Sequence, residues 1–512
     1  MSHLTRVSPL RVGIVLLCTA LVGWTGTRAI SAAVTTPAKP GSSTFAGYVD
    51  VTTTPTYPFE TPPGPAQSSV ILSFVVAGPG QPCTAMWGGV YTLGQAASRL
   101  DLDRRMSQLR LVGGQARVSF GGQAGKELAT TCTDPVALGE AYQSVVDRYK
   151  LTSVDLDLEG ASLADTAAAT RRAAAIKNVQ GRAKAAGRNL AVWLTLPVAT
   201  TGLTAQGTSA VAGMLSAGVD LAGVNGMTMD FGTLSPPAQP MAKAVIQAST
   251  ALHAQVRAAF ARAGRPLGDG SAWAKVGITP MIGQNDVASE KFTIADATAV
   301  NQFARSHGVG QLSMWSLNRD STCGPPLPKA LPVVQTSCSG IDQGTQSFAE
   351  VLAAHLSSTT AHLTSPSGAG GSPAPAPAAA TATEPVDDPA HSPFPVWDPL
   401  GAYPAGTKVV WHHQVFSARY WTTGIAPDTQ VSNAKDSPWT LVGPVLPGDT
   451  PAPMPTLPAG TYPQWSTTLA YVAGSRVQVG LVPYKAKWWS QGQKPGQSVA
   501  GGSPWLLVIP GT

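Results

Sequence analysis

Residues 153–186 read SVDLDLEGASLADTAAATRRAAAIKNVQGRAKAA, a short strand-like stretch followed by a long alanine-rich one. In the first part Asp155, Asp157 and Glu159 alternate with leucines, which is the period of two expected of a β-strand. Over Ala164–Ala186 small and apolar residues recur at helical spacing. The segment therefore predicts a strand and then a helix, with three carboxyl groups on one face of the strand.

The same alternation continues on both sides of this segment. Short β-branched runs predict further strands at Thr44–Val51, Ser69–Val76, Ala116–Phe120, Leu190–Pro197, Gly218–Met229, Lys275–Met281 and Gly310–Leu317. Stretches between them predict helices, among them Val136–Tyr149, Met241–Ala263 and Ile294–Ser306. Strand then helix, repeated over roughly 300 residues, is typical of a (β/α)8 TIM barrel, an α/β fold. A doubly wound open sheet is the alternative, but the turn after the first strand, DVTTTP at 50–55, has no glycine to cradle a phosphate.

The composition of the 512-residue chain narrows the classes of function. Hydrophobic residues make up 43%, enough for a sizeable core, whereas charged residues are only 12%, about half the usual ~25%. The net charge of +6 is spread along the chain without a block of Lys and Arg, which disfavours nucleic-acid binding. No pattern indicates a cofactor, a metal site or an obligate oligomer, so we expect a monomer with neither cofactor nor metal.

The first 35 residues are typical of a secretory signal peptide. Arg6 and Arg11 flank the start of an apolar run at 12–26, which is 15 residues long and shorter than the ~20 residues of a membrane span. We therefore expect a secreted, extracellular protein. A retained N-terminal anchor, which would attach the chain to a membrane, is the alternative.

The cysteines fit an exported chain. Four remain once Cys18 is removed with the signal segment. An even number in an exported protein predicts disulfides, and four cysteines allow three pairings. We favour Cys83–Cys132 together with Cys323–Cys338, because each bond then closes one local loop.

The composition changes sharply over 356–393, where Pro, Ala, Ser, Thr and Gly dominate and aromatic residues are absent. Such a stretch cannot bury a core and acts as a flexible, semi-extended linker. It separates a predicted catalytic domain at 44–355, called the body below, from a tail. The tail contains two predicted modules at 394–446 and 461–510, called the first and the second unit.

The two units repeat one sequence pattern. At an offset of 68 residues Trp397 aligns with Trp465, and further aromatic, glycine and valine pairs follow. After a two-residue deletion, Pro438-Trp439 aligns with Pro504-Trp505. Matches at so many rare residue types indicate two copies of one Trp-rich module.

The acidic face of the strand at 153–158 can carry chemistry. In a barrel the leucines pack against the surrounding helices, and the carboxyl groups point inward and climb to the C-terminal rim. Three carboxylates crowded at low dielectric cannot all ionise, so at least one pKa rises, which keeps a carboxylic acid protonated for general acid catalysis. The alternative reading is a solvated strand edge or a Ca²⁺ site.

This strand resembles the D-x-x-D-x-D-x-E motif of glycoside hydrolase family 18, the chitinases. Asp155, Asp157 and Glu159 match its last three acids, and Thr152 stands where the family has the first. Three more stretches resemble family motifs on other strands, in the family's order: Ser119-Phe-Gly-Gly122, Met227-Thr-Met-Asp230 and the segment around Trp315.

The resemblance implies a retaining mechanism with substrate assistance. Glu159 is expected to protonate the glycosidic oxygen and later to act as base, while the substrate's own 2-acetamido oxygen attacks the anomeric carbon. Asp157 is expected to hold the acetamido N–H, and Asp155 to share a proton with Asp157. The substrate is then chitin or another polysaccharide that contains N-acetylglucosamine.

Other site residues follow from the same motifs. Trp315 is expected to form the floor of the sugar site, and Met229 stands where many members carry a tyrosine whose hydroxyl supports the acetamido oxygen. The missing donor is expected from Tyr48, Asn225, Gln284 or Asn285, and losing it altogether would cost ~10²–10³ in rate. For Trp87 and Trp273 two positions are weighed, one in the cleft and one in the core. The full set of expected substrate contacts is Trp315, Met227, Met229, Asp230, Tyr48, Asn225, Gln284 and Ser119.

The two units of the tail resemble the small chitin-binding module of carbohydrate-binding family 5/12. Each carries an adjacent aromatic pair, Tyr420-Trp421 in the first unit and Trp488-Trp489 in the second. Because neighbours on a strand point to opposite faces, we expect Tyr420 and Trp488 to face the sugar and Trp421 and Trp489 to fill the core, with the reverse as the alternative. Trp439 and Trp505 are expected in the core.

Three functions are therefore weighed. The first is a secreted chitinase with two chitin-binding modules. The second is a chitin-binding, lectin-like protein whose barrel has lost activity, for which Met229 and Thr152 leave room. The third is a cell-wall hydrolase that acts on peptidoglycan.

Overall fold

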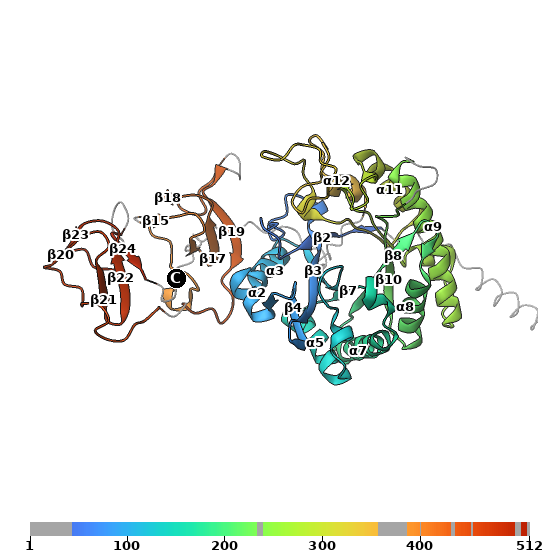
Figure 1. The fold of residues 1–512 in the computed structure, drawn as a ribbon, viewed down its shortest axis with the longest axis horizontal. Helices are drawn as coiled ribbons and strands as arrows, with labels where there is room; N and C mark the ends of the chain where they lie inside the picture. Colours follow the sequence, from blue (N-terminus) through green and yellow to red (C-terminus); the bar gives the residue numbers. More distant parts are fainter. Residues whose placement is uncertain are drawn as a thin grey trace, which may run out of the picture.

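The computed structural model describes residues 43–232, 239–356, 387–399, 401–431, 436–451, 454–496 and 503–508. The predicted signal segment (1–35) and most of the predicted linker (356–393) lie outside these residues. The described part forms an α/β body with the two all-β units beside it (Figure 1).

The body is built on a mixed sheet of mostly parallel strands. Every strand predicted from the sequence has a counterpart, and β7 (Ser153–Asp157) lies between its neighbours β6 and β8 in parallel register. The parallel strands, in their order across the sheet, are β1 (Thr44–Phe45), β14 (Gln311–Leu312), β11 (Val276–Thr279), β10 (Leu221–Met227), β8 (Ala191–Ala199), β7, β6 (Gln115–Gly121), β3 (Ser69–Gly78) and β2 (Gly47–Asp50).

The predicted barrel is borne out in part. The first strand is broken at Ala46 into β1, which pairs with β14, and β2, which pairs with β3, so no single continuous strand closes the ring. The sequence pattern also missed short antiparallel additions, which are β4 (Gln81–Trp87) and β5 (Tyr91–Thr92) beside β3, β9 (Gly202–Leu203) beside β8, and the separate pair β12 (Gly283–Gln284) and β13 (Lys291–Phe292).

The helices lie around the outside of the strands (Figure 1). Polar caps fix their starts: Asp134 accepts the N–H of Val136 at α5, and Asp165 accepts that of Ala168 at α7. The helices of the body are α2 (Leu93–Arg99), α3 (Leu102–Leu111), α4 (Leu128–Thr131), α5 (Pro135–Arg148), α6 (Gly160–Ala164), α7 (Thr166–Ala185), α8 (Ala205–Ser216), α9 (Met241–Arg262), α10 (Asp269–Trp273), α11 (Ile294–His307) and α12 (Phe348–Ala353), with 3-10 turns at Pro65–Gln67 and Leu317–Arg319.

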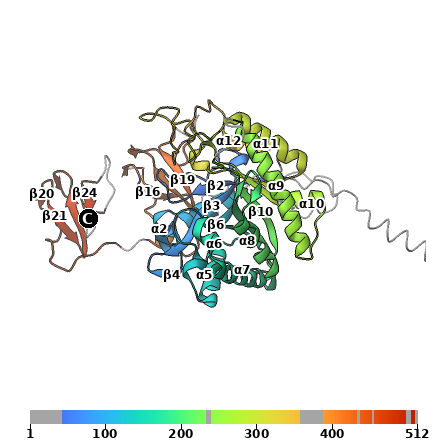
Figure 2. The same cartoon turned by 45° about the vertical axis from the view of Figure 1, so that its right-hand side comes forward.

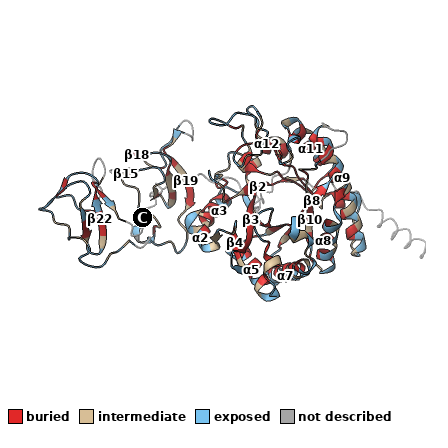
Figure 3. Cartoon of the chain, in the orientation of Figure 1, coloured by how far each residue is buried: buried red, intermediate tan, exposed pale blue. Residues whose placement is uncertain are grey.

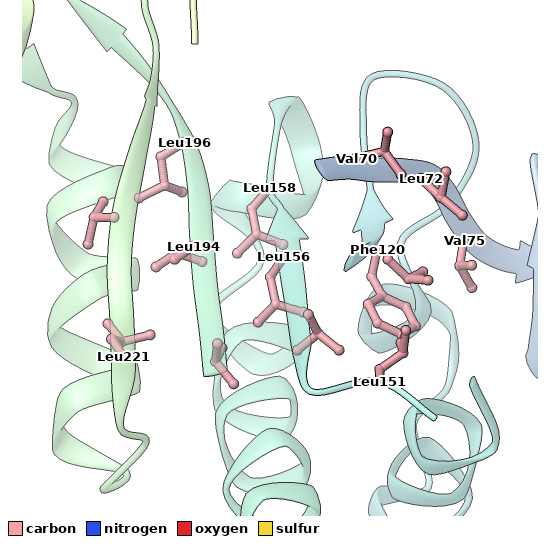
Figure 4. Packing of buried hydrophobic residues seen from close by; sticks show 14 of the residues in the cluster. Val70, Leu72, Val75, Phe120, Leu151, Leu156, Leu158, Leu194, Leu196 and Leu221 are labelled. Atoms are coloured by element: carbon pink, nitrogen blue, oxygen red, sulfur yellow. The ribbon is translucent and has the colours of Figure 1, made fainter. Parts of the chain in front are cut away.

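The core lies between the sheet and the helices. Leu156 and Leu158, the apolar face of β7 and its extension, are fully buried beside Leu194 and Leu196 of β8 (Figure 4). Figure 3 shows the strands buried and the outer helix faces exposed. The leucine face is therefore committed to the core, which leaves the carboxyl groups of β7 on the opposite face.

Both predicted disulfides are confirmed. Cys83 of β4 is joined to Cys132, which follows α4, and Cys323 is joined to Cys338 in the segment after β14.

Among the described helices, none has the length and apolar character needed to cross a membrane.

The two units share one topology, which confirms the repeat. In the first unit β16 (Lys408–Trp411), β17 (Gln414–Ala418) and β19 (Trp439–Pro444) form one sheet, and β15 (Ala402–Tyr403) pairs with β18 (Thr422–Thr423). The second unit repeats this order with β21 (Arg476–Val479), β22 (Val482–Ala486) and β24 (Trp505–Leu507), and with β20 (Ala470–Tyr471) paired to β23 (Ser490–Gln491).

Each unit has a small core of its own around a tryptophan. Trp439 is buried against Tyr403, and its indole N–H donates to the carbonyl of Ile425 at 2.9 Å. Trp505 is buried against Tyr471 and donates to the carbonyl of Gln493, the position 68 residues after Ile425. Both tryptophans lie in the core, as predicted.

Candidate active site

The row of acids begins inside the sheet and ends at the rim. Asp155 and Asp157 lie within β7, and Glu159 follows in extended backbone (φ −130°, ψ 161°) directly before α6. Because the chain stays extended from Asp155 to Glu159, all three carboxyl groups share one face, as the spacing predicts. Asp155 and Asp157 are buried, whereas Glu159 is half-buried.

Asp155 is held by three hydroxyl groups. Ser119 and Tyr48 donate to Oδ2 at 2.7 and 3.0 Å, and Thr195 donates to Oδ1 at 2.6 Å. Burial raises the pKa of Asp155, while the hydrogen bonds of Thr195 and Ser119 and the charge of Arg117 oppose that rise. The donors therefore fix this carboxyl group in place below the cleft.

Asp157 carries the most strongly disfavoured charge of the row. Burial raises the pKa of Asp157 well above its usual value, and the charges of Glu159 and Asp155 raise it further. Its Oδ1 is buried without a hydrogen-bond partner among the described residues. This atom is thus available to a ligand that enters the cleft.

Glu159 has the properties of a general acid. Burial, followed by the negative charge of Asp230, raises its pKa to about 7. A carboxyl group with this pKa is partly protonated at neutral pH and can both give and take a proton there. The prediction from the sequence that crowding raises carboxyl pKa values thus agrees with the direction found for every member of the row.

Asp157 and Glu159 open into a cleft with about 550 Å³ of empty space. Three aromatic rings lie at its floor: Trp315 stacks on Phe74 with ring centres 5.4 Å apart, and Tyr48 lies 5.9 Å from Trp315. The cleft is lined by Tyr48, Phe74, Gln123, Asp157, Glu159, Thr195, Met227, Met229, Asp230, Thr279, Met281, Asp286 and Trp315. A flat apolar floor beside acids is suited to a sugar ring.

The end of β10 supplies one wall of this cleft. Met227, Met229 and Asp230 all line it. Asp230 adopts a left-handed backbone (φ 48°), and its Oδ1 accepts the N–H of Val287 at 3.0 Å. Glu290 accepts the N–H groups of the two residues that follow Asp230, at 3.1 and 2.8 Å. These bonds hold the Asp230 carboxyl group near Glu159.

Four expected contacts lie behind the cleft wall. Ser119 and Asn225 are buried and bind Asp155 and Thr195 respectively. Gln284 and Asn285 turn into their own loop, where the side chain of Gln284 donates to carbonyl groups of Asn285, Ala288 and Glu290. The hydroxyl groups that line the described cleft belong instead to Tyr48, Thr195 and Thr279.

Trp87 and Trp273 belong to the core. Trp87 is fully buried and donates to the hydroxyl of Tyr149 at 2.9 Å. Trp273 stacks on His253 with ring centres 4.0 Å apart. Neither residue lines the cleft.

Sequence reasoning missed several cleft residues, among them Phe74, Gln123, Thr195, Thr279 and Met281. Phe74 was included in the predicted strand Ser69–Val76, and Thr195 in Leu190–Pro197. Inward alternation is the signal that could have identified Thr195, Thr279 and Met281, whereas Phe74 follows a register shift within β3 and Gln123 lies beyond the end of β6. Which inward residues converge, however, depends on the register between strands, which one sequence does not contain.

A second hollow, which Glu159 also lines, lies between the segment 122–131 and the start of α6. Its lining is polar and includes Gln123, Lys126 and Asp165. Glu159 and Gln123 line both the cleft and this hollow. Among the described residues, no group of three or more His, Cys, Asp or Glu side chains is arranged to hold a metal ion.

The aromatic pairs of the units correct one prediction. Trp421 and Trp489, expected in the core, are 61% and 60% exposed, and Tyr420 and Trp488 are 49% and 45% exposed. β17 ends at Ala418 and β22 at Ala486, so each pair lies in a bend after its strand, where the alternation of a strand no longer applies. Each unit thus presents both rings of its pair to the surface.

No protein-family model matches the chain. Over 320 residues the chain is 34% identical to a probable bifunctional chitinase/lysozyme of Escherichia coli (strain K12), which covers 60% of this chain and 34% of that protein. Over 239 residues it is 35% identical to Endochitinase 11 of Metarhizium anisopliae, covering 46% and 44% of the two chains. The chain is similar to chitinases.

A solved structure agrees with these relatives. The catalytic domain of a hyperthermophilic chitinase from Pyrococcus furiosus matches with a TM-score of 0.51 and 26% identity, over 61% of this chain and 94% of that one. The chain spans less than half the length of the two curated relatives, 34% and 44%. Together the likenesses support a glycoside hydrolase.

Proposed function

We propose that the body is a chitinase that hydrolyses β-1,4 linkages between N-acetylglucosamine units. The observation that carries this proposal is the position and state of Glu159: a half-buried carboxyl group with a pKa of about 7, beside a cleft with an aromatic floor. The sequence identity to chitinases supports the same substrate class.

In the proposed reaction, Glu159 donates its proton to the glycosidic oxygen as the bond to the anomeric carbon breaks. The acetamido carbonyl oxygen of the same sugar attacks that carbon and forms an oxazolinium ion. Asp157 accepts the acetamido N–H through its free Oδ1 and stabilises the positive charge. Asp155 shares a proton with Asp157 in this proposal, as in the family that the strand resembles. Glu159 then deprotonates a water molecule, which attacks the anomeric carbon and opens the oxazolinium ring. The configuration at that carbon is therefore retained.

The mechanism explains the choice of substrate. Attack from within the substrate requires an N-acetyl group at C2, which chitin has and cellulose lacks. Met229 has no hydroxyl group to support the acetamido oxygen, and Tyr48, Thr195 and Thr279 are the hydroxyl residues that line the described cleft. The hydroxyl protons of Tyr48 and Thr195 are donated to Asp155 and that of Thr279 to Asn225, so none of the three is assigned this role.

The test is hydrolysis of colloidal chitin by the wild type, by Glu159→Gln and by a matched control, Glu140→Gln. Glu140 is an exposed glutamate on α5 that pairs with Arg182. We expect acetylated chitooligosaccharides from the wild type and the control but not from Glu159→Gln, and NMR of the first product should show the retained anomer. Inverted product, or full activity of Glu159→Gln, would contradict the proposal.

A second candidate is hydrolysis of peptidoglycan. It is favoured by the name of the Escherichia coli relative, a probable chitinase/lysozyme. Both polymers carry 2-acetamido sugars, so the same chemistry serves either. Release of soluble fragments from purified peptidoglycan, with chitin left intact, would select this candidate, whereas a lectin-like protein would bind chitin and release products from neither.

The proposal extends to the tail and to the place of action. The exposed pairs Tyr420-Trp421 and Trp488-Trp489 support chitin binding by both units, because a flat ring can stack on the apolar face of a sugar. The two disulfides of the body support export to an oxidising compartment. A binding assay on pelleted chitin and detection of the protein in the medium test these two points.

A further inference from the structure

The first unit is in direct contact with the body. Strand β19 lies against α3, and the second unit lies farther out, with the first unit between it and the body (Figures 1 and 2). The hydrogen bonds and ion pairs of the described second unit (454–496 and 503–508) do not reach the body. The two copies of one module therefore differ in their relation to the catalytic domain.

Charged groups make this contact specific. Arg104 of α3 donates to the backbone carbonyl of Pro444 and to Oδ2 of Asp449, the latter at 3.0 Å. The same Asp449 oxygen accepts the N–H of Leu446 at 2.6 Å, which fixes the loop that follows β19. The side chain of Arg104 is only 8% exposed and that of Asp449 17%, so the ion pair is shielded from water.

A second ion pair lies beside the first. Lys408, at the start of β16, binds Oδ2 of Asp101, the residue directly before α3. In each ion pair one partner belongs to the body and the other to the first unit, and the signs are reversed between the two pairs. The body supplies Asp101 and Arg104, and the unit supplies Lys408 and Asp449. This arrangement sets one register between the surfaces, because sliding the unit would place like charges together.

In the first unit, Gly443 allows the backbone of β19 to approach α3 closely. Gly443 of β19 lies so near α3 that a Cβ atom would come within 2.8 Å of the Arg104 carbonyl oxygen and 3.0 Å of the Gln108 Cβ. Its φ of 145° also strains any other residue. The repeat aligns Gly443 (LVGP) with Ile509 (LVIP) in the second unit, so the second copy could not dock on this helix in the same way.

We propose that the first unit and the body form one rigid catalytic unit through the contact between α3 and β19. The exposed pair Tyr420-Trp421 lies outside this contact, so docking leaves it free and fixes its position relative to the cleft. The first unit then acts as a fixed extension of the substrate-binding surface, and the second unit binds the polymer independently. Only these roles of the two units in polymer binding rest on the proposed function.

The docking is tested by distances between spin labels in the full chain, in a Cys18→Ser background. One label is placed on the body at Lys184→Cys, and the other at one of two equivalent exposed sites, Thr423→Cys in the first unit or Gln491→Cys in the second. We expect a narrow distance distribution for the first pair of labels and a broad one for the second. Equally broad distributions would overturn the proposal.

Three variants examine the cause of the contact. Gly443→Ile, which copies the second unit, and Arg104→Glu should each broaden the distribution to the first unit, and adding Asp449→Arg to Arg104→Glu should narrow it again. Asp103→Asn, on the same helix but paired with Arg148, is the matched control and should change nothing. Gly443 lies in the first unit, so an unchanged melting temperature of the first unit separates undocking from misfolding. A distribution that stays narrow in Gly443→Ile would overturn the assigned contact.

The effect of docking on hydrolysis of insoluble chitin is measured in a separate assay. Gly443→Ile should lower the initial rate on insoluble chitin several-fold, because the fixed contact is replaced by a tethered one, and leave the rate on soluble chitooligosaccharides unchanged. An unchanged rate on insoluble chitin would overturn the fixed-extension role. If the distances are narrow but chitin is not hydrolysed at all, the docking stands and the proposed function fails.

Discussion

The cleft of the body and the aromatic pairs of the tail would bind the same polymer by opposite means. In the cleft the decisive groups are carboxyl groups removed from water, with Asp155 at 1% and Asp157 at 4% exposure. In the units they are flat rings left in water, with Trp421 and Trp489 near 60% exposure. Chemistry needs pKa values shifted by burial, whereas attachment to a surface needs only accessible apolar area.

The largest expected effect separates the two regions most sharply. Glu159→Gln keeps the shape of the side chain but removes the proton that the leaving group needs, so kcat should fall by ~10²–10⁴. Binding of this variant to pelleted chitin should equal that of the wild type, because the aromatic pairs are untouched. Both values come from one preparation, by product release and by depletion from the supernatant. Parallel loss of binding and activity would show that the two regions do not act separately.

The complementary change removes a pair of rings. The double variant Trp488→Ala/Trp489→Ala should lower apparent affinity for insoluble chitin by up to about 10²-fold, since the second attachment point is lost. The rate on a soluble chitooligosaccharide should not change. Trp505→Ala is an informative contrast, because it removes a core residue and should unfold the unit, which circular dichroism detects. A full rate loss on the soluble substrate would place these rings in catalysis and contradict the comparison.

Much of the fold was accessible from the sequence because its signals are local. The predicted Met241–Ala263 is α9 (Met241–Arg262), and the predicted strand Ser153–Leu158 is β7 (Ser153–Asp157). Each depends on the spacing of apolar residues within one element. The break of the first strand at Ala46 and the antiparallel additions β4, β5 and β9 were not accessible, because they depend on pairing between strands.

The site divides in the same way. Glu159, Asp157 and Trp315 were found from motifs on single strands, and the structure places all three in one cleft. Gln284 was expected there as a replacement hydrogen-bond donor, but its amide donates to carbonyl groups of its own loop. Trp421 was expected in the core because strand alternation was extended three residues past the end of β17 at Ala418. Sequence patterns thus fail where an element ends and tertiary contacts decide.

The smallest effect concerns the charge that tunes the acid. Asp230 raises the pKa of Glu159, so Asp230→Asn should lower that pKa and move the alkaline limb of the kcat profile to lower pH. The sign follows because Glu159 must be protonated to act, and its protonated form is lost as pH rises through its pKa, about 7 in the wild type.

The same variant decides which carboxyl group reacts. If Asp230 only tunes Glu159, kcat at the lower pH optimum should fall by well under ~10²-fold and the product should keep the retained configuration. If Asp230 were itself the nucleophile of a two-carboxylate mechanism, its loss would match that of Glu159→Gln, and azide would restore the rate by taking its place. A pH–rate profile and product NMR on a soluble substrate distinguish the two, because the exposed rings of the tail take no part in that reaction.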